Sequence, residues 1–168
     1  KKIFTHKDII KKISIIKKNK KKIVLCHGVF DLVHYGHILH LNSAKKFGDF
    51  LIVSVTSDKF VNKGPGKPLF SHFQRMNYLS NLEVVDAVIM SNTASAIDVL
   101  KLIKPNMYVK GPDYIKTKYD KTKKIVLEKN IVKSFGGEIK YTEDQAYSSS
   151  SIINSTGLIY NNDQRKFL

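Results

Sequence analysis

The chain has 168 residues, of which 42% are hydrophobic and 10% aromatic, as expected for one globular domain with a full core. The formal net charge of +15 predicts an anionic partner, although the lysine run over 17–22 is typical of a solvated surface. No apolar run is long enough to span a membrane, and the single cysteine, Cys26, stands within a short apolar run. We therefore expect a reduced, cytoplasmic protein that binds neither a membrane nor zinc.

Apolar spacing predicts helices that alternate with short strands along the chain. A first helix over 5–16 has Thr5 and Asp8 in the arrangement of a capping box, and a helix that begins near Tyr35 has Gly48 as its predicted C-terminal cap. Further helices are predicted over 71–81, 94–103 and 121–134, and from about 149. Strands are predicted over 23–26, 50–55, 87–90, 107–110 and 138–141.

This alternation predicts an α/β fold, a doubly wound, Rossmann-like parallel sheet of about five strands. We expect an N-terminal helix and basic linker over 1–22, a main domain over 23–155, and a polar tail over 156–168 that leads to a missing domain or ends the protein. Ligands of such sheets bind at the carboxyl ends of the strands. Four polar segments, GVFDLVHYGH, NKGPGKP, KGPDY and SSSS, are predicted to meet at that edge.

His34 and His37 stand three residues apart around Gly36, just after the first predicted strand. A helix that begins near Tyr35 places both imidazoles on one face of its first turn, where backbone N–H groups bind anions. Gly28 and Gly36 would let a phosphate or a base approach the backbone. A metal site is the other interpretation of the spacing, but no third ligand is evident, so we predict none.

The segment GVFDLVHYGH resembles the HxGH signature of the nucleotidyltransferase superfamily, in its cytidylyltransferase-like branch. The resemblance runs from about Thr5 to Asn154 and includes NKGPGKP, an FQR tripeptide, VDAVI, YVKGPDY and YSSSSIIN in the same order. It is strongest for the adenylyltransferase domains that make ADP-heptose. The resemblance implies an HxGH nucleotidyltransferase fold, with 23–155 as the nucleotidyltransferase domain.

The resemblance also implies a reaction in which a nucleoside triphosphate, here ATP, and a sugar phosphate such as heptose 1-phosphate form a nucleotide sugar and pyrophosphate. The acceptor phosphate is the nucleophile, so catalysis rests on positioning and charge neutralisation, with Mg²⁺ on the triphosphate. The implied catalytic residues are His34, His37, Lys63 and Arg75, and Lys67 is an implied phosphate ligand. The implied nucleotide-binding residues are Gly28, Val29, Phe30, Asp31, Gly36, Lys110, Gly111, Asp113, Tyr114, Ser148, Ser149 and Ser150.

Each of these motifs also has a purely structural interpretation. Lys63 and Lys67 flank a Gly-Pro-Gly turn that is equally typical of a solvated surface loop. For Arg75 the alternative is a surface salt bridge, for Asp113 a turn cap, and for the serines a helix cap. Pro112 replaces the second glycine of the family's more usual KGGDY, and serine replaces threonine in its STT segment.

The motifs indicate the class of reaction more specifically than they indicate the substrate. The alternative is a CTP-dependent cytidylyltransferase acting on glycerol 3-phosphate or another alcohol phosphate, but such enzymes usually carry an Arg-Thr-Glu-Gly run where this chain has EDQAY. His27 stands where the adenylyltransferases often have a smaller polar residue, so the sequence does not determine which nucleotide base is preferred. A non-catalytic nucleic-acid-binding module is less favoured, and we expect no nucleic-acid partner. Relatives tend to form homodimers and are often fused to a sugar kinase.

Overall fold

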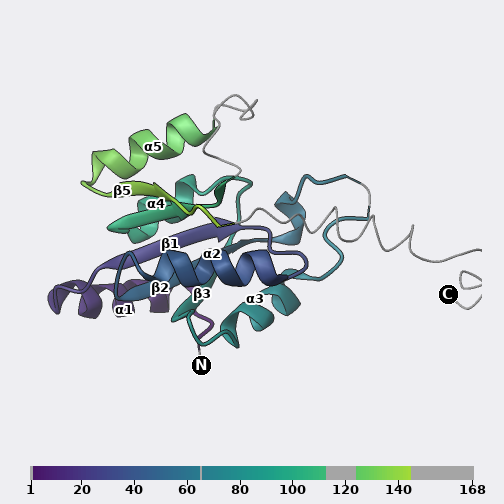
Figure 1. Cartoon of the computed structure of the whole chain (residues 1–168), viewed down its shortest axis with the longest axis horizontal. Helices are drawn as coiled ribbons and strands as arrows, with labels where there is room; N and C mark the ends of the chain where they lie inside the picture. The colour runs from purple at the N-terminus through teal and green to yellow at the C-terminus, as the bar shows by residue number, and fades with distance from the viewer. Residues whose placement is uncertain (1, 65, 113–123, 145–168) are drawn as a thin grey trace, which may run out of the picture.

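The computed structural model describes residues 2–64, 66–112 and 124–144 (Figure 1). Its strands are β1 (Ile23–Gly28), β2 (Phe50–Thr56), β3 (Ala87–Ser91), β4 (Met107–Lys110) and β5 (Glu138–Tyr141). They form one sheet in the order β3-β2-β1-β4-β5, and every neighbouring pair is parallel. The predicted fold class is therefore confirmed.

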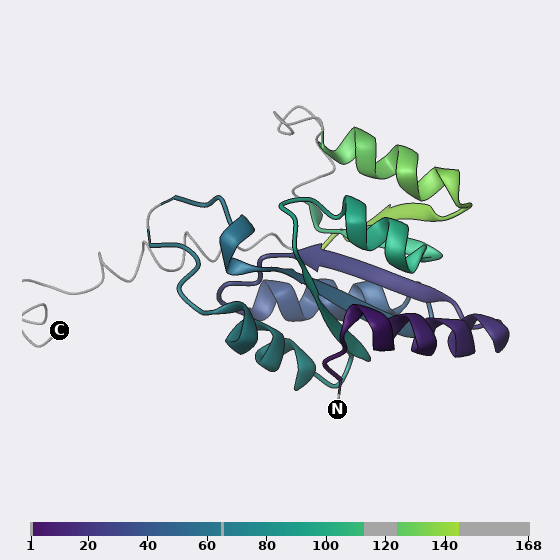
Figure 2. The same ribbon diagram turned by 180° about the vertical axis from the view of Figure 1, so that it is seen from behind.

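Helices cover both faces of this sheet (Figures 1 and 2). They are α1 (His6–Lys18), α2 (Tyr35–Lys45), α3 (His72–Ser80), α4 (Ile97–Ile103) and α5 (Lys124–Ser134), with a short 3₁₀ turn, η1 (Asp58–Phe60). Ile23 and Leu25 of β1 pack into the core beneath α1, α4 and α5, whereas Val24 and Cys26 pack into the core beneath α2 and α3. Because both faces of β1 are buried, its sequence is a continuous apolar run.

The segment before β1 packs into the same core as the sheet. The Phe4 backbone N–H donates to the Val88 carbonyl at 3.0 Å, and the Val88 N–H donates to the Lys2 carbonyl at 2.8 Å. Thr5 caps α1 as predicted, because its hydroxyl accepts a hydrogen bond from the Asp8 N–H at 3.2 Å. The tail predicted over 156–168 and the helix predicted from about 149 lie outside the described residues.

Helix α4 begins later than predicted, at Ile97 instead of Ala94. In the residues just before α4, side-chain hydroxyl groups donate hydrogen bonds to backbone carbonyls. Ser91 Oγ donates to the Thr93 carbonyl at 3.3 Å, and Thr93 Oγ1 donates to the Ser95 carbonyl at 3.0 Å. Such local hydrogen bonds compete with helical ones. The prediction from apolar spacing therefore begins the helix too early in the chain.

Gly48 has a packing role instead of the predicted capping role. Helix α2 ends at Lys45. A Cβ atom at Gly48 would lie 2.8 Å from Val24 Cγ2 and 2.9 Å from the Lys22 carbonyl oxygen. The glycine is thus required by the close approach of this turn to the beginning of β1.

The order of the strands determines where a ligand can bind. From β1 the chain adds β2 and β3 on one side and then β4 and β5 on the other, so the topological switch point lies between β1 and β4. GVFDLVHYGH follows β1, and KGPDY begins at the end of β4. Within the described ranges, no helix has the length and apolar character needed to cross a membrane.

Candidate functional site

His34 and His37 lie together at the N-terminus of α2, as their spacing predicted. His34 is the N-cap residue, and its backbone N–H donates to His37 Nδ1 at 3.4 Å. The two ring centroids are 3.9 Å apart. Burial lowers the pKa of His37 to about 4, with further lowering from His34, His40 and Lys63, and burial also lowers the pKa of His34. Both imidazoles are therefore neutral at pH 7 and carry one N–H each.

Phe30 supports this pair through an uncommon backbone conformation. Its φ is 52°, in the left-handed region that few non-glycine residues adopt, and its side chain is buried. The ring centroid lies 5.3 Å from that of His37. A Cβ atom at Gly28 would lie 3.0 Å from Phe30 Cε2. The predicted opening for a ligand at Gly28 is thus filled by the Phe30 ring.

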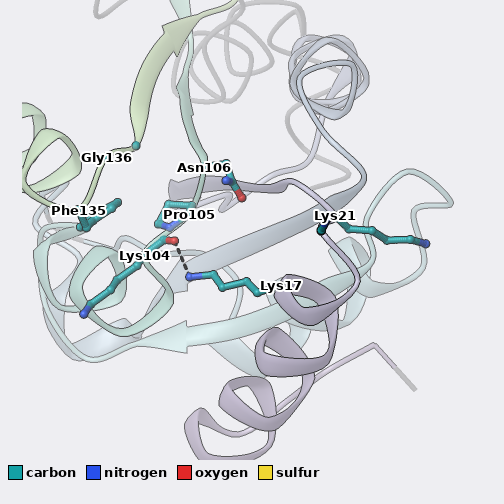
Figure 3. Close-up of a pocket in the computed structure, with 9 residues that line it drawn as sticks. Lys17, Lys21, Lys104, Pro105, Asn106, Phe135 and Gly136 are labelled. Carbon is teal, nitrogen blue, oxygen red and sulfur yellow. Dashed lines mark hydrogen bonds between the residues drawn. The ribbon is translucent and has the colours of Figure 1, made fainter.

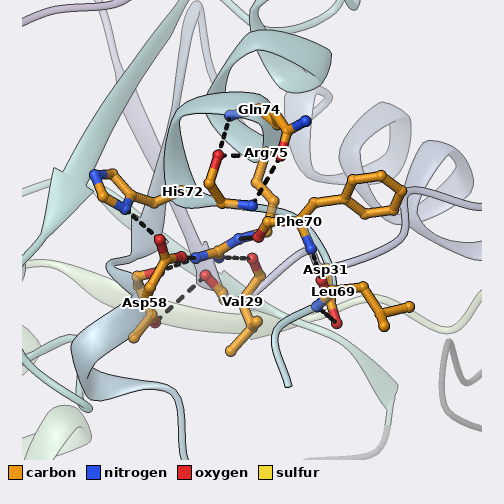
Figure 4. Close-up of polar contacts among 11 residues, drawn as sticks. Val29, Asp31, Asp58, Leu69, Phe70, His72, Gln74 and Arg75 are labelled. Atoms are coloured by element: carbon orange, nitrogen blue, oxygen red, sulfur yellow. Dashed lines mark hydrogen bonds and ion pairs between the residues drawn. The ribbon is translucent and has the colours of Figure 1, made fainter. Parts of the chain in front are cut away.

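Asp31 attaches the end of the loop that carries Lys63 and Lys67 to the segment GVFDLVHYGH, which contains His34 and His37. Its carboxylate is buried and accepts hydrogen bonds from the backbone N–H groups of Leu69, at 2.9 Å, and Phe70, at 3.0 Å (Figure 4). Asp31 was predicted to contact the nucleotide, but both of its oxygens bind protein backbone. The positive charge of Lys63, from the same loop, is the smallest of the four effects that lower the pKa of His37.

Arg75 is fully buried beneath the site (Figure 4). Its Nε donates to the Phe70 carbonyl at 2.9 Å, and its Nη1 donates to the Val29 carbonyl. Its Nη2 donates to the Thr56 carbonyl at 2.8 Å and to Asp58 Oδ1 at 2.6 Å. The alternative of a surface salt bridge is wrong. The guanidinium joins α3 to the segments at 29, 56–58 and 70, and the phosphate contact that the resemblance implied stays a prediction.

Asp58, the first residue of η1, completes this network. His72 Nδ1 lies 2.7 Å from Asp58 Oδ2, and Arg75 holds the other oxygen. Burial raises the pKa of Asp58, but the hydrogen bonds from Arg75 and His72 outweigh burial and leave this pKa below its ordinary value. Asp58 and Arg75 therefore form an ion pair that fixes the beginning of α3.

Lys110, the last residue of β4, forms a buried ion pair that the sequence did not predict. Its Nζ lies 2.7 Å from Glu128 Oε2, which also accepts a hydrogen bond from the Tyr108 hydroxyl at 3.1 Å. The Ala96 N–H donates to Glu128 Oε1 at 3.2 Å. Glu128 is 3% exposed, although it stands in KIVLEKN, a stretch with no local sign of a buried charge. Next along the chain, Gly111 has open space at its Cβ position.

His27 lies on the β1 side of the switch point. Its Nδ1 is 2.6 Å from the Ser54 hydroxyl oxygen. Burial lowers the pKa of His27 to about 4, while Glu128 opposes this effect and Lys110 adds to it. His27 is thus a neutral polar group near the end of β1, within electrostatic reach of the Lys110–Glu128 ion pair.

Helix α2 also contacts the segment after β5. His40 Nδ1 lies 2.9 Å from the Thr142 hydroxyl oxygen, and the Ser43 hydroxyl donates to Asp144 Oδ1 at 2.9 Å. These contacts bring the segment that leads to the four serines alongside α2.

The remaining predicted nucleotide ligands, Asp113, Tyr114, Ser148, Ser149 and Ser150, lie outside the described residues and stay predictions. Among the residues that the structure describes, no group of three histidine, cysteine, aspartate or glutamate side chains could hold a metal ion.

Comparison with known proteins agrees with this arrangement. The family model described as cytidylyltransferase-like matches residues 25–155, which contain the whole sheet from the third residue of β1 onwards. The chain belongs to the cytidylyltransferase-like family. This finding confirms the predicted family.

Two curated relatives of this cytidylyltransferase-like chain illustrate its place in the family. It is 35% identical over 144 residues to the bifunctional protein HldE of Campylobacter jejuni strain RM1221, covering 84% of this chain and 29% of the relative. It is 39% identical over 148 residues to the bifunctional protein HldE of Blochmanniella floridana, covering 85% of this chain and 29% of the relative. The chain therefore spans less than a third of the length of these relatives.

Solved structures agree with the cytidylyltransferase-like fold. The lipopolysaccharide core biosynthesis protein from Thermoplasma volcanium has a TM-score of 0.58 and 29% identity, covering 76% of this chain and 99% of that protein. Pantoate-beta-alanine ligase from Francisella tularensis has a TM-score of 0.57 and 21% identity, covering 90% of this chain and 72% of that protein. The second similarity is informative about the fold alone.

Proposed function

We propose that this chain is a nucleotidyltransferase that joins ATP to a sugar phosphate such as heptose 1-phosphate, releasing pyrophosphate. The observation that carries the proposal is the pair of histidines at the N-terminus of α2, whose ring centroids lie 3.9 Å apart and whose pKa values are lowered by burial. The charge of Lys63 lowers the pKa of His37 further. Imidazole N–H groups, a helix N-terminus and an ammonium group together bind phosphates.

The reaction needs no protein nucleophile. An oxygen of the acceptor phosphate attacks the α-phosphorus of the triphosphate, and the bond from that phosphorus to the bridging oxygen breaks as pyrophosphate leaves. His34 and His37 donate hydrogen bonds to the phosphates as charge moves onto the leaving group. Lys63 supplies positive charge from its loop, which Asp31 holds in place. Catalysis is then electrostatic stabilisation in a fixed geometry.

We propose that Mg²⁺ enters as part of the nucleotide substrate. The phosphates would be its main ligands, as is usual for Mg²⁺ at nucleotide sites.

A sugar phosphate is the favoured acceptor. The curated relatives share the name HldE, and the structural relative at 29% identity is named for lipopolysaccharide core biosynthesis. The alternative, a CTP-dependent enzyme acting on an alcohol phosphate, gains no support from these names. Because the relatives are bifunctional and more than three times as long as the matched part, we propose that this activity is paired with a second one, which the family resemblance implies is a sugar kinase. From the same resemblance we propose a homodimer in the cytoplasm.

The experiment is pyrophosphate release with each nucleoside triphosphate and Mg²⁺ against sugar 1-phosphates, glycerol 3-phosphate and phosphocholine. We expect release with ATP and a heptose or hexose 1-phosphate. Release with CTP and an alcohol phosphate would replace this proposal with the alternative. No release with any pair, although the nucleotides bind, would contradict a catalytic role for this chain.

A further inference from the structure

A pocket lined by lysines lies at the amino edge of the sheet, opposite the histidine site (Figure 3). It is formed by the turns that precede β1, β4 and β5, which lie at that edge because the strands are parallel. Its volume is about 360 Å³, within the range of small-molecule sites. The charged side chains that line it are Lys17, Lys20, Lys21 and Lys104.

A structural role accounts for one of these lysines. Lys17 Nζ donates to the Ile103 carbonyl at 3.2 Å and to the Lys104 carbonyl at 2.9 Å, so Lys17 caps the C-terminus of α4. Burial and the charge of Lys104 both lower the pKa of Lys17. The pocket thus holds positive charges that repel one another.

The described residues show no such helix-capping hydrogen bond from the ammonium groups of Lys20, Lys21 or Lys104. Within the described part of the chain, the ammonium groups of Lys20, Lys21 and Lys104 form no ion pair, and no carboxylate lines the pocket. Lys21 and Lys104 extend from opposite sides of its rim (Figure 3). Both ammonium groups point away from the pocket in this view, and each stands at the end of a flexible four-carbon stem (Figure 3).

Two of the lysines occupy backbone positions that favour glycine. Lys20 has a φ of 57° and Lys104 a φ of 46°, and each stands just past the last residue of a helix, where glycine is the usual choice. Lysine is less stable than glycine in this conformation. The helix dipole offsets part of this cost, because it favours a positive charge near a helix C-terminus, and both charges stand on the pocket rim.

We propose that this pocket binds a small molecule that carries a multivalent anionic group of the phosphate class. The concave shape favours a small ligand over the backbone of a nucleic acid, and the ring of Phe135 adds an apolar wall. Gly136 leaves open space where a side chain would stand. This site is separate from that of the proposed reaction, because the histidine site lies at the other edge of the sheet.

The test is an NMR titration of the ¹⁵N-labelled chain with inorganic tripolyphosphate. Amide shifts of Asn106, Gly136 and Gly137 report the lysine pocket, and those of Gly28 and Gly36 report the histidine site. We expect saturable shifts at both sites in the wild-type chain. The double variant K20G/K104G removes two charges while relieving strain, so it keeps the fold. We expect it to weaken binding at the pocket about tenfold and to leave the histidine site unchanged.

The matched control is K11A/K12A, which removes two exposed lysines of α1 that do not line the pocket. It lowers the net charge equally and is expected to bind tripolyphosphate at the pocket like the wild-type chain. The proposal is overturned if the pocket amides show no saturable shift. It is overturned equally if the two double variants weaken the binding to the same extent, since general charge would then explain it.

Discussion

Replacement of Arg75 by methionine tests whether the buried guanidinium holds the site together. The change removes hydrogen bonds to three backbone carbonyls and the ion pair with Asp58. Removing one partner of a buried ion pair costs about 3–5 kcal/mol, a large share of the roughly 5–15 kcal/mol that stabilises a typical domain. We therefore expect the free energy of unfolding to fall by about 4 kcal/mol, measured by urea denaturation followed by circular dichroism.

Two further variants sharpen this test. Arg75→Lys keeps the charge but has one nitrogen in place of a planar fork, so we expect an intermediate loss of stability. Lys101→Met, at an exposed position of α4, is the control and is expected to change the free energy of unfolding by less than about 0.5 kcal/mol. If Arg75→Met unfolds at the wild-type urea concentration while turnover is lost, Arg75 acts on the substrate, and the structural role assigned here is wrong.

Three other predictions follow from the same structure. Glu128→Gln leaves Lys110 buried without its counter-charge and is expected to lower the free energy of unfolding by about 3 kcal/mol; an unchanged urea midpoint would contradict this. Gly28→Ala pushes a methyl group against the Phe30 ring and is expected to cost about 1–3 kcal/mol, so an unchanged melting temperature would refute the contact. The pKa of His27 is about 4 in the folded chain and 6.5 in the unfolded chain, so between these pH values only the unfolded chain is protonated at this residue. The free energy of unfolding is therefore expected to fall as the pH is lowered from 6.5 to 4. Denaturation at several pH values checks this, and His27→Asn is expected to reduce the slope.

Local sequence was sufficient to predict most of the fold. All five strands were predicted, and β1, β2 and β3 are the clearest of them because a strand buried on both faces is an apolar run. The N-cap at Thr5 was predicted because its acceptor function is local. The beginning of α4 was predicted incorrectly, because hydrogen bonds from the hydroxyl groups of Ser91 and Thr93 compete with helical hydrogen bonds there. Propensity and spacing do not show which hydrogen bonds a hydroxyl group will choose.

The candidate site was predicted where its residues are close in sequence. The spacing of His34 and His37 was enough to place them together, since residues three apart lie on the same face of a helix. Glu128 was missed because its partners come from β4 and from the residue before α4. The burial of Arg75 was also missed, since its acceptors lie on segments that only the tertiary fold brings together.

The most direct test of the proposed chemistry is acceptor-dependent pyrophosphate release by His37→Ala, compared with the wild-type chain and with His6→Ala. His6 is an exposed histidine on α1 and is the control. We predict that His37→Ala, confirmed as folded by circular dichroism, loses at least about 100-fold in kcat, while His6→Ala keeps the wild-type rate. Turnover by His37→Ala within a few-fold of the wild-type rate would contradict the role of the histidine pair.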